Sequence, residues 1–230
     1  GWTVDGEGKA MHKSLGNGVD PADVFNENGA DILRLWAASA DYHADVRCSK
    51  EIFKQLSQNY LKFRNTCKFM LDNLVDFDPE KLTKPEDMPV LDRWLLTKLN
   101  ELIEKAEQSY CDYEFHIITH AVNDFCVTTL SSFYLDIVKD CLYCDGADSL
   151  SRRSAQTALY LTLHTLAKLF APILAFTCDE IWLQMPHRDG DDGRNVLLNQ
   201  MSKPYADYAL SDAEMAVWET ALRVRSDLNG

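Results

Sequence analysis

The feature that most constrains the fold is a long apolar seam in the first half of the chain. Its members follow Ser49 at alternating spacings of three and four residues: Phe53, Leu56, Tyr60, Phe63, Cys67, Met70 and Leu74. This period places the side chains on one face of an α-helix of about seven turns. Ser49 and Glu51 suit the start of that helix, as N-cap and as first-turn acid. The seam therefore predicts a long amphipathic helix whose apolar face needs partners.

Three further segments show helical patterns of similar length. They run from about Val90 to Tyr110, from Tyr113 to about Tyr143, and from Leu150 to Met185. The expected core positions of the middle segment are Phe115, Ile118, Val122, Phe125, Phe133, Ile137 and Cys141. Pro172 lies inside the last segment and lacks a backbone N–H, so we expect a kink or a break near residues 170–171.

The first 40 residues predict shorter elements. Residues 1–7 have the pattern of a strand end followed by a turn. A short helix is expected to begin with Asp20 as N-cap and Pro21 at its first position. It should end near Asn28-Gly29, and a second helix should follow over about residues 30–40.

Two polar segments and a capping signal complete the chain. Residues 76–89 contain two prolines and several charges and are predicted to connect two long helices. Residues 186–204 are rich in Gly and Asp, so we expect an exposed loop there. Ser211 and Glu214 have the spacing of a capping box, which predicts a last helix running to the end of the chain.

These elements predict an all-α protein. Four long helices form an antiparallel helical bundle, and a small motif-bearing subdomain precedes it. The expected divisions are residues 1–48 for the subdomain, 49–185 for the bundle, and 186–230 for a loop and the start of a C-terminal helix. Because the chain opens with Gly1 directly ahead of a motif, we expect it to be part of a longer protein.

The composition limits the classes of partner. A net charge of −13 argues against general affinity for nucleic acids, although a local basic strip stays compatible with it. No apolar run approaches the roughly 18 residues that span a bilayer, and no signal peptide opens the chain, so no membrane partner is expected. The seven scattered cysteines are typical of small apolar residues in a reducing, cytoplasmic setting. Cys141 and Cys144 form a C-x-x-C pair, which leaves a metal or redox site as the alternative.

One glycine-flanked loop carries the strongest chemical signal. Residues 8–17 read Gly-Lys-Ala-Met-His-Lys-Ser-Leu-Gly-Asn. Lys13 is a flexible point charge that can follow a polyphosphate, and the Ser14 hydroxyl and free backbone N–H groups can add hydrogen bonds. The flanking glycines would let such a loop close and reopen. The alternative is a solvated surface turn ahead of a helix.

The order Met-x-Lys-Ser-x-Gly-Asn resembles the mobile Lys-Met-Ser-Lys-Ser loop of class I aminoacyl-tRNA synthetases. Further stretches resemble the isoleucyl members of that family in chain order: residues 1–8, 29–36, 41–47, 133–136, 152–157, 171–174 and 179–182. The resemblance spans nearly the whole chain. It implies a ligase of protein biosynthesis whose partners are ATP, isoleucine and tRNA(Ile).

The same resemblance implies roles for the loop residues. Lys13 corresponds to the second lysine of the loop and Ser14 to its last serine, and these two steady the phosphates of ATP, with Mg²⁺, while the adenylate forms. Met11 would anchor the loop. The implied ATP loop as a whole comprises Met11, His12, Lys13, Ser14, Gly16 and Asn17. Ala10 and His12 depart from the usual pattern, which leaves one cation fewer unless Lys9 or a protonated His12 takes its place.

The helical bundle would then be an anticodon-stem-binding domain. Phosphate contacts need basic side chains, and the candidates are Lys50, Lys54, Lys62, Arg64, Lys68, Arg152 and Arg153. The adjacent pair Arg152 and Arg153 is favoured, because a helix start offers them nothing through the helix dipole. The heptad spacing assigns Phe53, Tyr60 and Phe63 to the core and not to stacking on bases.

The sequence lacks other parts of the family's machinery. It contains no His-x-Gly-His tetrad, no editing domain and no cysteine-rich zinc region. We therefore expect no metal site here, we expect isoleucine to bind elsewhere, and we expect the chain alone not to activate isoleucine. Two alternatives stay open: the same region of a valine, leucine or methionine enzyme, or a helical interaction scaffold with a chance loop match.

Overall fold

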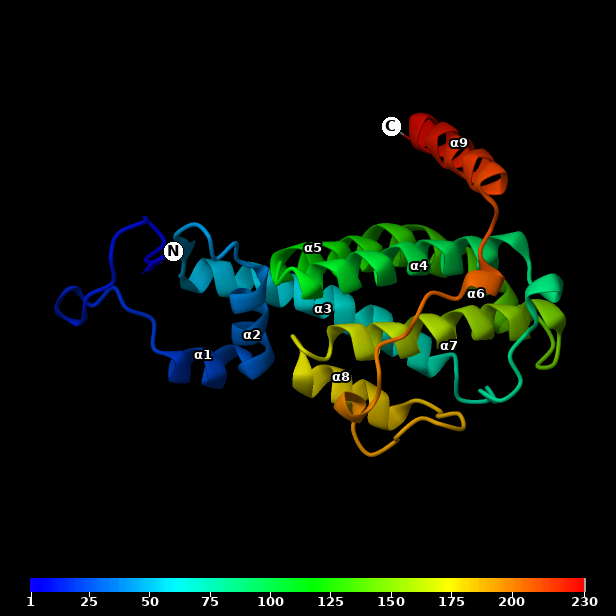
Figure 1. Ribbon diagram of the computed structural model, residues 1–230, viewed down its shortest axis with the longest axis horizontal. Coiled ribbons are helices and arrows are strands. Elements are labelled where there is room, and N and C mark those ends of the chain that lie inside the picture. The colour runs from blue at the N-terminus through cyan, green and yellow to red at the C-terminus, as the bar shows by residue number, and fades with distance from the viewer. Residues whose placement is uncertain (230) are drawn as a thin grey trace.

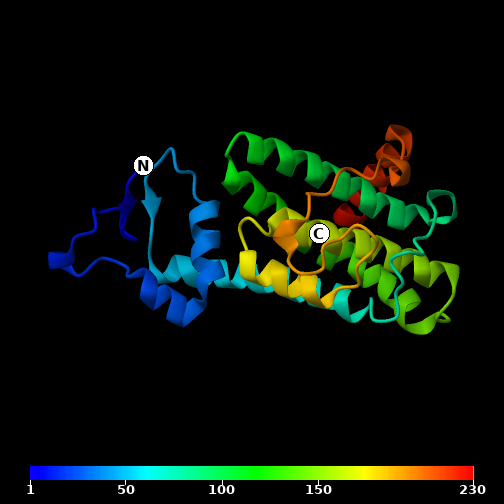
Figure 2. The same cartoon turned by 60° about the horizontal axis from the view of Figure 1, so that its bottom comes forward.

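The computed structural model describes residues 1–229 and confirms an all-α architecture. A small N-terminal subdomain lies at one end of the long helices, and the last helix, α9, leaves the bundle at the other end (Figure 1). The same division is visible after the molecule is turned (Figure 2). No helix within residues 1–229 combines the length and the apolar character needed to cross a membrane.

The N-terminal subdomain is built from short elements. Strand β1 (Thr3–Val4) pairs in parallel with β2 (Val46–Arg47), so the two ends of the subdomain meet. Between them lie α1 (Pro21–Asn28) and α2 (Ala30–Ser39). The Asp20 carboxylate accepts from the Ala22 N–H at 2.9 Å, which confirms the predicted cap. Gly29 ends α1 and has a φ of 87°, a conformation that favours glycine.

The first two long helices agree with the sequence pattern. Helix α3 (Lys50–Asp72) begins where the Ser49 hydroxyl accepts from the Ile52 N–H, and α4 covers Val90–Cys111. The predicted connection between them contains one 3₁₀ turn, Pro85–Asp87. Phe53 and Phe63 are buried and Tyr60 packs against the core, as the seam predicts.

The third long segment differs from an ordinary helix. It begins as α5 (Phe115–Asp124), continues as a π-helix over Phe125–Tyr134, and ends as α6 (Leu135–Cys144). A π turn holds more residues than an α turn, so the buried face rotates along the segment. Ile137, an expected core position, is 45% exposed, and its neighbour Val138 is buried instead. The predicted seam was therefore wrong at Ile137, whereas Cys141, its last expected member, packs against the core.

The fourth long segment breaks where Pro172 predicts. Helix α7 ends at Phe170 after beginning at Leu150, and α8 covers Ala175–Gln184. Nearly every α7 side chain from Ser154 to Phe170 is buried, so α7 is the central helix of the bundle. Several of its buried polar groups find partners on neighbouring elements: Ser154 donates to Asp92 at 2.6 Å, and the Gln156 amide donates to the Asn73 carbonyl at 2.9 Å.

The segment after α8 is less exposed than the sequence predicts. The buried side chains His164 and Trp182 need polar partners, and this loop supplies them: His164 Nε2 lies 3.1 Å from the Asp191 carboxylate, and Trp182 Nε1 donates to the Asp192 carbonyl. Val196, which belongs to this segment, is buried. The rest of the segment is exposed or half-buried, so the expected exposed loop is confirmed except at Val196 and at the two aspartates that bond to the bundle.

The last helix, α9 (Asp212–Asn229), begins with the predicted capping box. The Ser211 N–H and hydroxyl both donate to the Glu214 carboxylate, and the Glu214 N–H donates back to the Ser211 hydroxyl. Trp218 holds α9 against Trp94 and Phe133 of the bundle.

The buried apolar residues form two clusters. The larger one joins the helices of the bundle. The smaller one, Val24, Ile32, Cys48 and Phe53, lies within the N-terminal subdomain and includes the first turns of α3. Helix α3 therefore contributes to the apolar clusters of both parts of the molecule.

Candidate functional site

The glycine-flanked loop is closed at its base by Asp5 and Asn17. The Asn17 amide donates to the Asp5 carboxylate at 2.8 Å and to the Ala10 carbonyl, and its oxygen accepts from the His12 N–H. Asp5 also accepts from the N–H groups of Glu7 and Lys9. These hydrogen bonds, that of Lys9 first, lower the pKa of Asp5 and keep it ionised. Asn17 was an expected loop residue, whereas Asp5 was missed, although an Asp ahead of two glycines is a recognisable turn signal.

The tip of the loop presents the two residues expected to handle phosphate. Lys13 and Ser14 stand in a 3₁₀ turn, Lys13–Leu15, that is exposed throughout, and Gly16 closes the turn in the left-handed conformation. Within the described residues, the backbone N–H groups of Lys13 and Ser14 have no acceptor. A cation, a hydroxyl and two free amides therefore face solvent together, which is a donor set that fits a phosphate group.

The neighbours of the tip have separate roles. Met11 packs against the small cluster of the subdomain, so it anchors the loop although it is only half-buried. His12 is exposed. Lys9 forms an ion pair with Glu7 at 2.7 Å, and Ala10 offers no charge. In the described part of the chain, Lys13 is thus the one loop cation without a carboxylate partner.

A strip of basic side chains follows α3 on the side opposite its buried seam. Lys50, Lys54, Arg64 and Lys68 share this side by helical period, and Lys62 lies at its edge; all five are exposed. We call these five residues the α3 strip. Acidic residues occur in α3 only near its ends, at Glu51 and Asp72. Lys50 reaches Glu27 at 3.4 Å and Lys68 reaches Asp72 at 2.9 Å, whereas no ion pair involves the other three within residues 1–229.

The favoured pair Arg152 and Arg153 has partners inside the protein. Arg152 holds the Asp76 carboxylate with two nitrogens, at 2.7 and 2.9 Å, and also donates to the carbonyls of Leu142 and Ala147. Arg153 bonds to the Asp76 carbonyl and to the exposed Asp148. Both arginines therefore tie the α3–α4 connection to the start of α7. The sequence offered no signal for this, because Asp76 is far away along the chain.

The pattern of titratable groups gives no indication of a metal centre. Within residues 1–229, no group of three or more His, Cys, Asp and Glu side chains is arranged to hold a metal ion. Cys141 is half-buried and Cys144 is exposed, and both thiols are free.

Comparison with known families assigns both parts of the chain. The family model described as "Anticodon-binding domain of tRNA ligase" matches residues 92–229, more than half of the chain. The model described as "tRNA synthetases class I (I, L, M and V)" matches residues 1–49, which include the loop.

Individual relatives agree with this assignment. The chain is 49% identical over 227 residues to the isoleucine–tRNA ligase of Moorella thermoacetica, covering 98% of this chain and 24% of that protein. It is equally similar to the isoleucine–tRNA ligase of Geobacillus kaustophilus, covering 99% of this chain and 25% of that protein. The chain thus spans about a quarter of the length of these relatives.

A solved structure shares the fold. The LeuRS of Agrobacterium radiobacter K84, in a ternary complex with tRNA and LeuAMS, matches with a TM-score of 0.69 at 19% identity. The match covers 92% of this chain and 24% of that one. The predicted resemblance to isoleucyl-tRNA synthetases is confirmed, and the chain belongs to the family of tRNA-ligase anticodon-binding domains, with class I synthetase sequence at its N-terminal end.

Proposed function

We propose that this chain serves an isoleucine–tRNA ligase as its ATP loop and its tRNA-binding bundle. The observation that carries the proposal is the end-to-end similarity to isoleucine–tRNA ligases, at 46–49% identity over nearly the whole chain. The partners would be tRNA(Ile), ATP with Mg²⁺, and isoleucine bound outside this chain. Such an enzyme would work in the cytoplasm, beside its tRNA. The division into residues 1–48, 49–185 and 186–230 belongs to the same proposal, with α3 shared between the first two parts.

In this proposal Lys13 and Ser14 act on the phosphates of ATP. As isoleucyl-adenylate forms, negative charge builds up on the departing pyrophosphate. The Lys13 ammonium can follow that charge on its flexible stem, while Ser14 and the two free amides donate hydrogen bonds. Asp5 and Asn17 hold the base of the loop, so that only its tip needs to move.

The loop supplies one mobile cation in place of the usual two. Lys9 is paired with Glu7 on an exposed surface, where such pairs are worth about 0–1 kcal/mol, so Lys9 can be released at little cost. Met11, Gly16 and Asn17 would shape the loop, and His12 would take no part while neutral.

The bundle would bind the tRNA stem through the α3 strip. This strip concentrates positive charge on a protein whose net charge is −13, which directs a polyanion to one surface. Lys54, Lys62 and Arg64 are its most available members, since they have no ion pair within the described residues. The proposed tRNA surface leaves out Arg152 and Arg153, the pair that the sequence favoured, because their guanidinium groups already hold Asp76.

The salt dependence of tRNA binding tests the strip. Each phosphate contact contributes about 0.7–0.9 to the slope of log K against log salt concentration. Replacing Lys54, Lys62 and Arg64 by alanine should therefore lower the magnitude of this slope by about 2 to 3. A matched control removes three exposed lysines outside α3, namely Lys84, Lys105 and Lys203. Equal slopes for the two triple variants would show that net charge, and not the strip, governs binding.

Pyrophosphate exchange tests the loop. This chain alone should not catalyse isoleucine-dependent ATP–pyrophosphate exchange. Placed in the Geobacillus kaustophilus ligase instead of the segment that it matches, it should restore exchange, and Lys13→Ala should lower kcat by about 10²-fold. Lys105→Ala, which removes an exposed lysine of α4 outside the loop, is the control and should change kcat little. Unchanged kcat in Lys13→Ala would remove Lys13 from the proposed chemistry.

A further inference from the structure

The break between α7 and α8 leaves backbone groups without their helical partners. In a continuous helix the N–H groups of Phe176 and Thr177 would donate to the carbonyls of Pro172 and Ile173. These two hydrogen bonds are not made, and the regular pattern resumes only where the Cys178 N–H donates to Leu174. Two donors and two acceptors must therefore find other partners.

Two side chains of α2 satisfy all four groups. The Asp31 carboxylate accepts from the Thr177 N–H at 2.8 Å and from the Phe176 N–H at 3.4 Å. The Arg34 guanidinium donates to the Ile173 carbonyl at 2.9 Å and to the Pro172 carbonyl at 2.7 Å. One acid and one base, three residues apart on one face of α2, thus substitute for both missing backbone hydrogen bonds.

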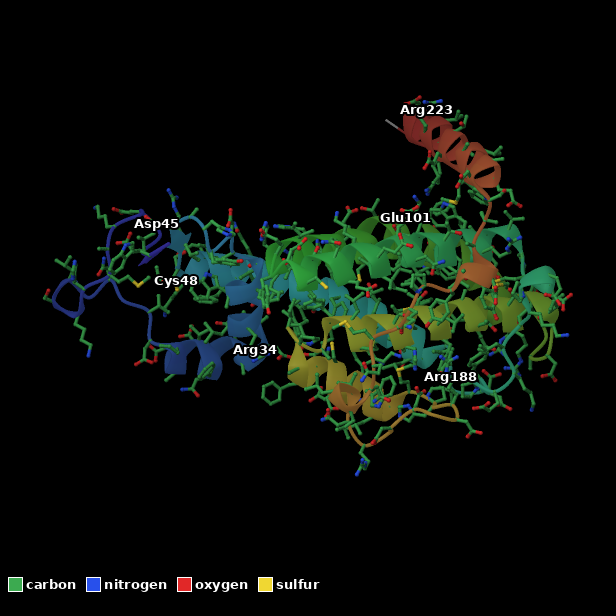
Figure 3. The ribbon with its side chains drawn as sticks, in the orientation of Figure 1. Arg34, Asp45, Cys48, Glu101, Arg188 and Arg223 are labelled. Atoms are coloured by element: carbon green, nitrogen blue, oxygen red, sulfur yellow. The ribbon has the colours of Figure 1, made fainter. Side chains whose placement is uncertain are left out.

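The charges also match the two helix ends. A carboxylate is favourable at the N-terminus of α8, and a guanidinium is favourable near the C-terminal end of α7. Asp31 and Thr177 are both buried, and the Thr177 hydroxyl donates to Asp31 at 2.6 Å and lies 3.1 Å from the Tyr60 hydroxyl of α3. Arg34 lies at the junction of α2 with the bundle (Figure 3). Replacing Asp31 or Arg34 by a neutral residue would remove this favourable interaction with the helix end.

The position of α2 gives this contact its significance. The phosphate loop leads through α1 directly into α2, and Asp31 and Arg34 fix α2 to the broken helix at the centre of the bundle. Any rotation of α2 would break four hydrogen bonds that are partly shielded from water. The orientation of the loop subdomain relative to the α3 strip therefore depends on this contact as well as on α3.

We propose that Asp31 and Arg34 are positioning residues. Their hydrogen bonds bridge the α7–α8 break, a contact that we call the splint, and thereby keep the ATP loop correctly oriented relative to tRNA bound on the bundle. This inference rests on the proposed function for its consequence in catalysis, and on geometry alone for the splint. In an intact ligase, loss of the splint should spare adenylate formation and impair transfer to tRNA, because only transfer requires both parts to be aligned.

The splint itself is tested on this chain. Amide hydrogen exchange of Phe176 and Thr177 should accelerate at least about tenfold in Asp31→Ala, which removes their acceptor, and much less in Asp31→Asn, which keeps an oxygen.

Spin labels at positions 23 on α1 and 81 in the α3–α4 connection, with Cys111 and Cys144 replaced by serine, should give one narrow distance distribution. That distribution should broaden in Arg34→Ala and be restored in part by Arg34→Lys. Arg223→Ala, on an exposed position of α9 (Figure 3), is the control. Unchanged exchange and unchanged distances would overturn the splint.

The catalytic consequence is tested in the Geobacillus kaustophilus ligase carrying this chain. Arg34→Ala and Asp31→Ala should leave pyrophosphate exchange within about twofold of the unmodified enzyme, while kcat for tRNA charging falls about tenfold or more and KM for tRNA changes little. Arg34→Lys and Asp31→Asn should recover part of the lost charging rate. A parallel loss of both activities would reduce the two residues to fold stability and overturn the positioning role. If the ligase that carries the unmodified chain fails to charge tRNA(Ile), the proposed function is wrong. The amide hydrogen exchange and the spin-label distances still test the splint in that case.

Discussion

Removing the Arg152 side chain should destabilise the bundle and leave tRNA affinity nearly unchanged. Arg152 makes four hydrogen bonds that join the end of α6, the α6–α7 turn and Asp76, and its side chain is 16% exposed. Breaking a fully buried ion pair costs about 3–5 kcal/mol. Because the Asp76 side chain is 42% exposed and stays hydrated after the change, we discount this to about 2–3 kcal/mol.

Thermal unfolding measures this cost. For a chain of this size, 1 kcal/mol corresponds to about 2–4 °C, so Arg152→Ala should lower Tm by about 5–10 °C. Arg223→Ala, whose side chain is exposed, should lower Tm by less than about 2 °C. The hydrogen bond from Arg152 holds the pKa of Asp76 well below its usual range. A carboxyl whose folded pKa is lowered stabilises the fold above its unfolded value of 3.8 and loses that effect as the pH falls further.

The difference in stability between wild type and Arg152→Ala should therefore be full at pH 7 and should shrink below about pH 4. The same variant should bind tRNA with wild-type affinity at temperatures where it is folded. An unchanged Tm combined with a clear loss of tRNA affinity would instead establish Arg152 as a phosphate contact.

Two further predictions concern the central helix. Burial lowers the pKa of His164 to about 4, although the Asp191 carboxylate opposes this shift. The histidine of the unfolded chain therefore takes up a proton at higher pH than the folded one does. The free energy of unfolding of the wild type should fall by up to about 3 kcal/mol between pH 6.5 and pH 4. Urea unfolding of His164→Gln over the same pH range should lack this loss, and a parallel pH profile would contradict it. Leu159 is completely buried on α7, so Leu159→Ala should cost about 2–5 kcal/mol in urea unfolding, against less than about 0.5 kcal/mol for the exposed Leu197→Ala; a small cost at Leu159 would contradict its central place.

The elements that local sequence controls were predictable. The α3 seam, the Asp20 and Ser211 caps and the break at Pro172 depend on residues within a turn or two of each other, and the structure agrees with each. The π-helix was not predictable in this way. Its apolar residues fit an α period almost as well, and only packing decides which side chains are buried: the π-helix packs against α3 and α4, and α6 packs against α7.

The parts of the site that depend on distant residues were also hidden. The basic strip follows from the helical period of α3 alone, and the loop motif is contiguous, so both could be identified. The partner of Arg152 is Asp76, and the partners of Asp31 and Arg34 lie around Pro172, all far apart along the chain. Such pairs exist only once the bundle has formed, and an isolated charge on a helix gives no sign of which ones will meet.

In the proposed function, this chain recognises the tRNA of an isoleucine–tRNA ligase. The most direct test is equilibrium binding of the 230-residue chain to tRNA(Ile), and to the same tRNA with an altered anticodon, over a series of salt concentrations. We predict tighter binding to tRNA(Ile), a preference that persists at moderate salt, and a slope that the α3 triple variant reduces. Equal affinity for both tRNAs at every salt concentration, or negligible binding at moderate salt, would contradict the account.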